Sequence, residues 1–270
     1  MGSSVIDWEK VWAEKAEETK RVTNVEYWNR RAEDYNDYIR TSNYEHGREI
    51  RKVFEREGIL NQEFEVLDIA AGPGSVTIPF AEVVKRVISI EPSEEMRKRL
   101  ADNAMEHGLN NVEILAKRWE DTDVRLYHKC FDIVICCHAL WHFPNVMTQI
   151  IKMAEACRGY CCIGEGVGAW GSVYGMYKKL GIDSHSFDYF IHLYNILYQN
   201  GIVTNVRIVD TVMRRSVESG IRMWELVLSK YRKPTEEDRK LIREHVMAHS
   251  RDGVYERRSK MGIIWWKVEN

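Results

Sequence analysis

The sequence predicts an α/β protein in which a mostly parallel sheet of seven strands is covered by helices on both faces. Short apolar runs recur along the chain and alternate with segments of helical periodicity, which is typical of parallel strands joined by crossover helices. The runs are almost continuously apolar, as expected of strands buried on both faces. With 270 residues, 44% of them apolar, the chain can form a substantial hydrophobic core.

The predicted strands are bounded by turn residues and are rich in β-branched and aromatic side chains. They are Phe64–Ile69, Val87–Ile90, Val112–Leu115, Phe131–Cys136, Tyr160–Ile163, Val206–Val217 and Gly262–Val268. Helices are predicted over Ser93–His107, Val146–Cys157 and Phe187–Gly201. The glycine-rich segment 164–175 is expected to be a loop beside a site.

Two helical segments are predicted to lie outside this alternation. Residues 1–60 form an N-terminal helical cap, with Asp7 as a helix N-cap and Gly58 as a helix end. Residues 61–270 form the main domain, with a helical insertion at about 218–258. Both segments are expected over the carboxyl ends of the strands, where open α/β sheets bind ligands. The pattern of residues 1–60 fits a lid over a site and ordinary packing equally well.

Charge and hydropathy exclude several classes of protein. Lys plus Arg number 39 and Asp plus Glu number 41, so the formal net charge is −2 and gives no general attraction to nucleic acid or anionic membranes. No apolar run approaches the roughly 18–20 residues that span a bilayer. No basic and then apolar leader is seen at the start. We therefore expect a cytoplasmic protein without membrane insertion; the sequence does not indicate its oligomeric state.

The six cysteines are expected to be reduced thiols. Cys136 and Cys137, and likewise Cys161 and Cys162, are adjacent within predicted strands, where neighbouring side chains point to opposite faces. Adjacent cysteines also raise the possibility of a thiophilic acceptor such as arsenic. Their position within strands is better explained by small apolar core residues.

No metal site is expected from the spacing of histidines and cysteines. The CxxC spacing of zinc sites is absent. His245 and His249 are four residues apart on a predicted helix, which is a chelating spacing. A third ligand is not evident, and Val246 stands where a zinc hydrolase would have its acidic residue. Surface histidines are the preferred interpretation.

The most informative segment is the glycine-rich turn after the first predicted strand. Asp68 ends the strand, and the turn continues through Ala70, Gly72 and Gly74 into a helix. Such a turn lets a ligand approach the backbone without meeting a Cβ atom, and it presents N–H groups at a helix start. Glu91 follows the next strand, 17 residues after Gly74, where a carboxylate can accept hydrogen bonds from ribose hydroxyls. The pattern predicts a nucleotide-like cofactor.

The same turn argues against a nicotinamide dinucleotide. Thr77 stands where the dinucleotide fingerprint has its third glycine, and Pro73 separates the first two. A nicotinamide-dependent oxidoreductase is therefore a less favoured alternative.

Further segments are in register with a known family. Residues 111–121 include the third strand and the turn after it, and residues 131–143 include the fourth strand and the turn after that. With the glycine turn and Glu91, they make the chain resemble class I S-adenosylmethionine-dependent methyltransferases of the small-molecule type, which includes quinone-biosynthesis enzymes. The resemblance implies a Rossmann-like fold with an antiparallel last strand, and S-adenosyl-L-methionine as cofactor.

The resemblance also implies which residues bind the cofactor. They are Trp28, Asp68, Ala70, Gly72, Gly74, Glu91, Pro92, Arg118, Trp119, Glu120 and Cys137. Arg118 is a departure, because family members commonly have an aspartate there that accepts from the adenine amine, and an arginine has only donors. Trp119 is expected to supply a backbone N–H and a stacking surface instead.

The implied reaction is direct displacement of the activated methyl group by an aligned acceptor. Where the acceptor needs a general base, His138 and His142 stand on the turn after the fourth strand. Packing is the ordinary alternative for both. Tyr27, a third catalytic candidate, forms with Trp28 an aromatic pair like the one that closes over the family's cofactor. Candidates to line an acceptor pocket are Trp170, Tyr174, Tyr177, Phe187 and Tyr194.

The expected function is methyl transfer to a small-molecule acceptor. A nucleic-acid substrate is not expected, because the sequence has no basic stripe interleaved with aromatic residues. The alternative of another class is a non-catalytic S-adenosylmethionine-binding partner or regulatory protein. The motifs do not identify the acceptor, because they describe the cofactor site rather than the variable segments around it.

Overall fold

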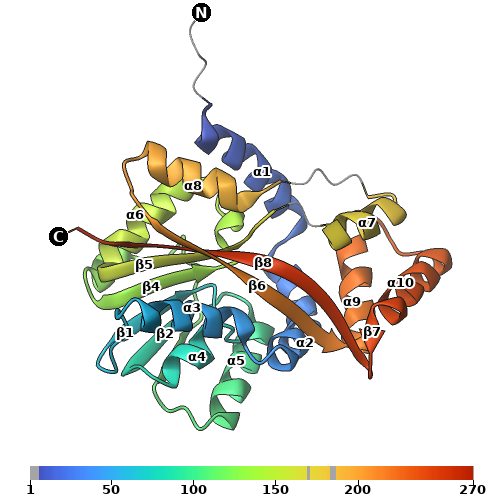
Figure 1. The fold of residues 1–270 in the computed structure, drawn as a ribbon, viewed down its shortest axis with the longest axis horizontal. Coiled ribbons are helices and arrows are strands. Elements are labelled where there is room, and N and C mark those ends of the chain that lie inside the picture. Colours follow the sequence, from blue (N-terminus) through green and yellow to red (C-terminus); the bar gives the residue numbers. More distant parts are fainter. Residues whose placement is uncertain (1–5, 169–170, 183–186, 270) are drawn as a thin grey trace, which may run out of the picture.

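The computed structural model describes residues 6–168, 171–182 and 187–269. These residues form one sheet in the strand order β3-β2-β1-β4-β5-β8-β6, with β7 paired to β8 (Figure 1). The strands are β1 (Glu65–Ile69), β2 (Arg86–Ile90), β3 (Val112–Leu115), β4 (Phe131–Cys137), β5 (Cys157–Gly166), β6 (Asn205–Ser216), β7 (Ser250–Arg251) and β8 (Val254–Lys267). The first five strands pair in parallel, and β8 is antiparallel to both β5 and β6. The predicted α/β class, with its antiparallel last strand, is confirmed.

The sheet differs from the prediction at its far edge. β8 begins at Val254 rather than at Gly262, because its pairing with β6 continues to Ser216 opposite Val254. Figure 1 shows β6 and β8 continuing beyond the sheet toward α9 and α10. Charged residues alternate with half-buried ones between Val254 and Lys260, so this part of the strand has no continuous apolar run. The two-residue β7 was not predicted.

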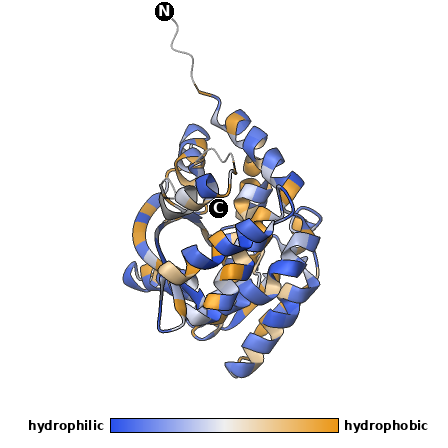
Figure 2. Ribbon diagram, turned by 90° about the vertical axis from the view of Figure 1, so that its right-hand side faces the viewer, coloured by the Kyte–Doolittle hydropathy of each residue, from blue (hydrophilic) through white to orange (hydrophobic). Residues whose placement is uncertain are grey.

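The helices are α1 (Trp8–Val22), α2 (Val25–Thr41), α3 (Glu45–Arg56), α4 (Thr77–Ala81), α5 (Glu94–Glu106), α6 (Val146–Ala156), α7 (Gly171–Lys179), α8 (Tyr189–Gln199), α9 (Val217–Leu228) and α10 (Glu236–Ala248), with 3₁₀ turns η1 (Val124–Tyr127) and η2 (Leu140–His142). Asp7 caps α1 as predicted, accepting from the Lys10 N–H at 2.9 Å. Apolar and polar residues alternate along the helices (Figure 2). No helix in the described ranges is long and apolar enough to cross a membrane.

The expectation of a loop over residues 164–175 is wrong in part. β5 extends to Gly166, and α7 begins at Gly171. Met176 of α7 and the following Leu180 are buried against Trp224 in a cluster of their own. This apolar packing stabilises a helix that the glycine content disfavours.

Two core clusters lie on the two faces of the sheet. Cys136 and Cys161 belong to one, whereas Cys162 belongs to the other and Cys137 packs against it. Adjacent cysteines therefore do point to opposite faces, and all six are free thiols.

The helices of residues 1–60 pack in different places. The Trp12 indole of α1 donates to the Phe143 carbonyl at 2.9 Å, beyond β4. α2 contacts α5, β6 and α9, and so lies between the main domain and the insertion. α3 contributes Ile50 and Phe54 to a core cluster of the sheet. The division into a cap of residues 1–60 and a domain of residues 61–270 stays a prediction.

Candidate active site

The candidate site lies where the strand order reverses. β1 and β4 are neighbours, and the chain proceeds outward from them in opposite directions, to β2 and to β5. Open α/β sheets bind ligands at the carboxyl ends of strands at such a point. A small cavity there is lined by Tyr35, Asp68, Ala70, Ala71, Gly72, Ser75, Val76, Cys137 and His138. The structure thus brings together five residues predicted from the sequence.

The turn after β1 has a left-handed backbone at three positions. Ala70, Gly72 and Gly74 have φ values of +56°, +55° and +98°. A Cβ at Gly74 would lie 2.6 Å from Leu100 Cδ1, so glycine allows α5 to pack on the turn. A Cβ at Gly72 would meet only Tyr35 Cε1, at 3.8 Å. The space above Gly72 is therefore bounded by α2.

Glu91 holds this turn in place. Its Oε2 accepts from the Gly72 N–H at 2.8 Å, and its Oε1 accepts from the Ser93 N–H at 2.7 Å. The carboxyl group is buried, and burial raises its pKa. The carbonyl of Pro92 accepts from the Arg97 guanidinium at 2.7 Å. Contact of Glu91 with a ribose stays a prediction. Each carboxylate oxygen keeps a second lone pair that can accept a hydrogen bond from a ribose hydroxyl.

Asp68 is tied to the start of α4 by Thr77. The Thr77 hydroxyl donates to Asp68 Oδ2 at 2.6 Å and lies 2.8 Å from Ser89 Oγ. Burial raises the pKa of Asp68 to about 7. In the sequence Thr77 is conspicuous only because it stands where the dinucleotide fingerprint has its third glycine. Its hydrogen bond to Asp68 was not predicted.

Two polar atoms of the cavity have no hydrogen-bond partner among the described residues. They are Ser75 Oγ and His138 Nε2, and both are buried. Buried polar groups normally have partners, so these atoms indicate a polar ligand. The cavity has a volume of about 30 Å³, which is about that of one water molecule.

The two candidate histidines differ in their surroundings. His138 has φ +54°, and its Nδ1 lies 3.4 Å from Oε1 of the buried Glu165. His142 stacks on Trp141, with ring centroids 3.8 Å apart. Burial lowers the pKa of His142 to about 3, so its imidazole is neutral and a weak base at neutral pH. This finding argues against His142 as the general base.

α2 presents aromatic rings to this site. The Trp28 ring lies 5.4 Å from that of Tyr27, 5.6 Å from that of Tyr35 and 5.9 Å from that of His142, measured between centroids. The Tyr27 hydroxyl accepts from Arg31 at 2.8 Å. Burial raises the pKa of Tyr27, so its hydroxyl is protonated at neutral pH. The predicted aromatic pair therefore lies between the turn after β4 and a cluster of charged residues.

That charged cluster joins α2 to β6, beside Lys230 of the insertion, and was not predicted from the sequence. Asp34 Oδ2 lies 2.9 Å from Arg31 Nε and 3.3 Å from an Arg215 nitrogen, and all three side chains are buried. The Lys230 ammonium lies 4.4 Å from the centre of the Tyr27 ring. Burial, together with Arg31, lowers the pKa of Lys230 to about 7. In the sequence, the opposite charges of Arg31 and Asp34 on the aromatic face of α2 are the feature that could have indicated this cluster.

The segment predicted to bind adenine lies apart from the cavity lining. Arg118 is exposed and forms an ion pair with Glu120 at 3.3 Å. The Trp119 ring is buried in a core cluster, and Lys152 Nζ lies 4.6 Å from its centre. Lys152 also donates to the Trp119 carbonyl at 2.6 Å. The ring of Trp119 is thus packed as a core residue, which argues against its expected role as a stacking surface.

The candidates for an acceptor pocket that fall within the described residues lie on different elements, and their role stays a prediction. Trp170 and the side chain of Tyr174 lie outside the described residues. Tyr177 contacts Trp224 of the insertion, with ring centroids 5.9 Å apart. Phe187 stacks on His192, whereas Tyr194 lies on α8.

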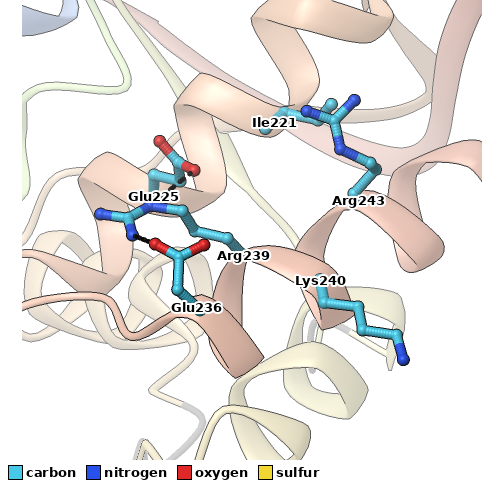
Figure 3. Close-up of a pocket in the computed structure, with 6 residues that line it drawn as sticks. All are labelled: Ile221, Glu225, Glu236, Arg239, Lys240 and Arg243. Carbon is cyan, nitrogen blue, oxygen red and sulfur yellow. Dashed lines mark hydrogen bonds and ion pairs between the residues drawn. The ribbon is translucent and has the colours of Figure 1, made fainter.

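A larger hollow of about 340 Å³ lies between α9 and α10 (Figure 3). It is lined by Ile221, Glu225, Glu236, Arg239, Lys240 and Arg243. Arg239 forms ion pairs with Glu225, at 3.6 Å, and with Glu236. None of the predicted site residues lines this hollow.

The histidine pair of the insertion also differs from its prediction. His245 is buried rather than on the surface, and its ring lies 4.3 Å from that of His249. Its Nε2 lies 3.4 Å from the Tyr255 hydroxyl. The pair is part of the packing of the insertion.

Comparisons with known proteins match part of this chain to methyltransferases. Residues 66–158 match a family described as "Methyltransferase domain". An uncharacterized protein of Haemophilus influenzae is 23% identical over 210 residues, 76% of each chain. The 23S rRNA (uracil(1939)-C(5))-methyltransferase RlmD of Edwardsiella ictaluri is 31% identical over 91 residues, which cover 33% of this chain and 21% of that relative.

Solved structures share the fold at low sequence identity. YcgJ of Bacillus subtilis has a TM-score of 0.54 and 17% identity, over 82% of this chain and 99% of that one. Magnesium protoporphyrin IX methyltransferase from Synechocystis has a TM-score of 0.50 and 15% identity, over 84% of each chain. Residues 66–158 therefore form a methyltransferase domain, and the chain has the fold of the class I S-adenosylmethionine-dependent methyltransferases, as the resemblance in the sequence implied.

Proposed function

We propose that this protein transfers the methyl group of S-adenosylmethionine to a small-molecule acceptor held between the turn after β4 and helix α2. The observation that carries the proposal is the cavity at the reversal of strand order, where Ser75 Oγ and His138 Nε2 are buried without partners among the described residues. A hydroxyl, an imidazole and the backbone of a glycine turn fit the polar end of the methyl donor. S-adenosylmethionine supplies an activated methyl group, so the protein mainly has to align the acceptor and exclude water.

The donor side of the site is assigned to the turn and the strand ends around it. We expect Ala70, Gly72 and Gly74 to give the donor access to the backbone, while Asp68 and Glu91 hold the turn through Thr77 and the Gly72 N–H. The further cofactor contacts expected at Trp28, Pro92, Cys137 and Arg118–Glu120 stay predictions.

The acceptor side is assigned to α2 and the insertion. Tyr27 and Trp28 supply aromatic surface, and His138, oriented by Glu165, is the better placed of the two candidate bases. Buried Arg31, Asp34 and Arg215 combine two positive charges with one negative charge. Such a surplus favours an acceptor that carries negative charge, because the acceptor would offset it.

The match to RlmD suggests an alternative function, which is methyl transfer to RNA. The match with RlmD of Edwardsiella ictaluri covers 21% of that protein and lies within the methyltransferase fold that many acceptor classes share. The net charge of −2 also offers no general attraction to a phosphate backbone. We therefore favour the small molecule.

The test is release of S-adenosylhomocysteine from S-adenosylmethionine in the presence of acceptors. The panel contains small carboxylates, phenols and thiols in one arm and ribosomal RNA in the other. We expect turnover in the small-molecule arm, lowered by roughly 10²–10⁴-fold in His138→Ala if that imidazole is the base. Turnover with RNA alone would contradict the proposed acceptor class. Tight donor binding with no turnover on any acceptor would favour a non-catalytic partner protein.

A further inference from the structure

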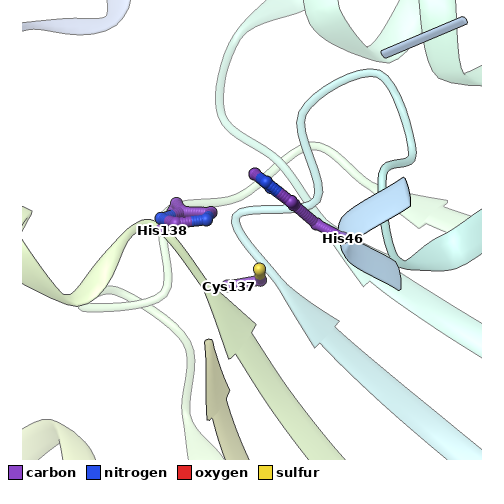
Figure 4. Close-up of side chains that lie close together, drawn as sticks. All are labelled: His46, Cys137 and His138. Atoms are coloured by element: carbon purple, nitrogen blue, oxygen red, sulfur yellow. The ribbon is translucent and has the colours of Figure 1, made fainter. Parts of the chain in front are cut away.

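Three ligand-type side chains meet beside the donor cavity. They are His46 in the first turn of α3, Cys137 at the end of β4, and His138 directly after it. One ligand atom from each lies within 4.8 Å of the other two. Figure 4 shows the two imidazoles next to each other, with the Cys137 thiol close to both, and their ring centroids lie 4.6 Å apart. His46 is separated from the other two residues by about 90 positions, so only the fold brings the set together.

Both histidines are oriented by hydrogen-bonding neighbours. His138 Nδ1 lies 3.4 Å from Glu165 Oε1, which leaves His138 Nε2 buried and without a partner in the described part of the chain. The Tyr38 hydroxyl lies 3.3 Å from each ring nitrogen of His46. A carboxylate on one imidazole nitrogen, with the other nitrogen open, is the arrangement that orients histidine ligands in metal sites.

Two glycines make room for this cluster. A Cβ at Gly47 would lie 2.1 Å from the Ser75 carbonyl oxygen, so glycine allows α3 to bring His46 against the turn after β1. A Cβ at Gly164 would lie 2.7 Å from Cys137 Sγ. The close approach of α3 and the space for the thiol both depend on a missing side chain.

The geometry points to a site for a thiophilic divalent cation such as Zn²⁺, bound by His46, Cys137 and His138. Sulfur and imidazole nitrogen are ligands that zinc and cobalt accept in tetrahedral geometry. With metal–ligand distances near 2.0–2.3 Å, the ligand atoms around tetrahedral zinc lie roughly 3.3–3.6 Å apart. Displacements of the ligand atoms by about 1 Å, through side-chain rotation, would bring the three residues to this geometry. Binding replaces the thiol proton by the metal, and one proton leaves to solvent.

Three protein ligands leave the fourth coordination position open, as in catalytic rather than structural zinc sites. Cys137 and His138 also line the donor cavity. The open position is therefore available to an electron-pair donor atom of a bound molecule. Metal bound at His138 Nε2 occupies the lone pair that a general base would use, so in the metal-bound protein His138 is a ligand and not the base. The metal site can be tested without a methyl donor or an acceptor.

The test is titration of the metal-free protein with Co²⁺, followed by absorption. We expect one equivalent to produce tetrahedral d–d bands and a thiolate-to-cobalt charge-transfer band. Cys137→Ser should remove the charge-transfer band, whereas Cys130→Ser, at a thiol just before the opposite end of β4, should leave it unchanged. Zn²⁺ should displace the cobalt and abolish the spectrum.

Further variants keep the test decisive if Cys137→Ser does not fold. His46→Gln and His138→Gln should each weaken cobalt binding by at least about tenfold, and Glu165→Gln by about 10–100-fold through loss of orientation. His249→Gln controls for the histidine pair of the insertion and should have no effect. Absence of a charge-transfer band in the wild-type protein, or a band that survives loss of Cys137, would overturn the site and leave the cluster as packing. Either result leaves the methyltransferase assignment untouched.

Discussion

The turn after β1 and the helix that covers it are held in place by different kinds of contact. Asp68 and Thr77 are 9 residues apart, and Gly72 and Glu91 are 19 apart. In contrast, the bond between Arg215 and Asp34 spans 181 residues, and the one from the Ser219 hydroxyl to the Asp34 carbonyl spans 185. The proposed donor side is thus a local structure, whereas the proposed acceptor side is formed only when distant segments pack together.

The largest expected effect concerns the long-range side of this comparison. Asp34→Asn leaves Arg31 and Arg215 buried without their carboxylate, so we expect the free energy of unfolding to fall by about 3–5 kcal/mol. Glu33→Gln, at the adjacent position of α2, removes an exposed partner of Arg222 and should cost less than about 1 kcal/mol. Urea denaturation measures both. Equal losses would mean that the buried charges do not hold α2 to β6.

The second prediction concerns the local side and depends on pH. Burial raises the folded-state pKa of Asp68 to about 7, above the value near 4 of an unfolded chain. The stability that this group contributes is therefore complete below about pH 4 and is lost as the pH rises through 7. Asp68→Asn should gain stability relative to wild type across this range, by at most about 1.4 kcal/mol per pH unit.

Asp132→Asn is the control for this pH dependence. Burial opposes ionisation of Asp132, but the Arg158 guanidinium outweighs it and lowers the pKa. Its contribution is therefore present above about pH 4 and is lost only as the pH falls further. Urea denaturation at pH 5 and pH 8 should show a pH-dependent effect for Asp68→Asn and a constant one for Asp132→Asn. The same effect of Asp68→Asn at both pH values would contradict a raised pKa.

The third prediction concerns the contact between the two sides. Tyr35 bounds the space above Gly72. Tyr35→Ala should weaken S-adenosylmethionine binding by about tenfold, because the ring no longer covers the bound donor. Tyr35→Phe keeps the ring and should bind normally. Binding that is unchanged in Tyr35→Ala would show that α2 does not close over the donor.

The smallest expected effect concerns strain in the turn. Ala70 has φ +56°, a region that costs a residue with a Cβ roughly 1–2 kcal/mol. Ala70→Gly should therefore raise the free energy of unfolding by about 1 kcal/mol, or by less once the added chain entropy is counted. Ala71→Gly, at the neighbouring buried position with no positive φ, should lower it. Thermal unfolding distinguishes the two, and a loss of stability in both would mean that Ala70 is not strained.

The same contrast explains what the sequence could predict. The strand pattern and the turn from Asp68 to Gly74 are local features, so the fold class and the position of this turn at a strand end could be predicted, whereas its contact with a methyl donor stays a prediction. Arg215, Lys230 and His46 belong to the site through packing over long distances, and a single sequence does not display such neighbours. Trp119 shows the reverse case, because its motif position predicts a ligand contact, whereas the structure places its ring in a core cluster.

The most direct test of the central claim is calorimetric titration with S-adenosylmethionine of the wild-type protein, Gly72→Ala and Gly108→Ala. Gly72 and Gly108 have φ values of +55° and +66°, so both substitutions impose a similar backbone penalty, but only Gly72 lines the cavity. We predict one site in the wild-type protein, binding at least about tenfold weaker in Gly72→Ala, which is about 1.4 kcal/mol, and unchanged binding in Gly108→Ala. No binding by the wild-type protein, or equal affinity in all three, would contradict a donor site at this turn.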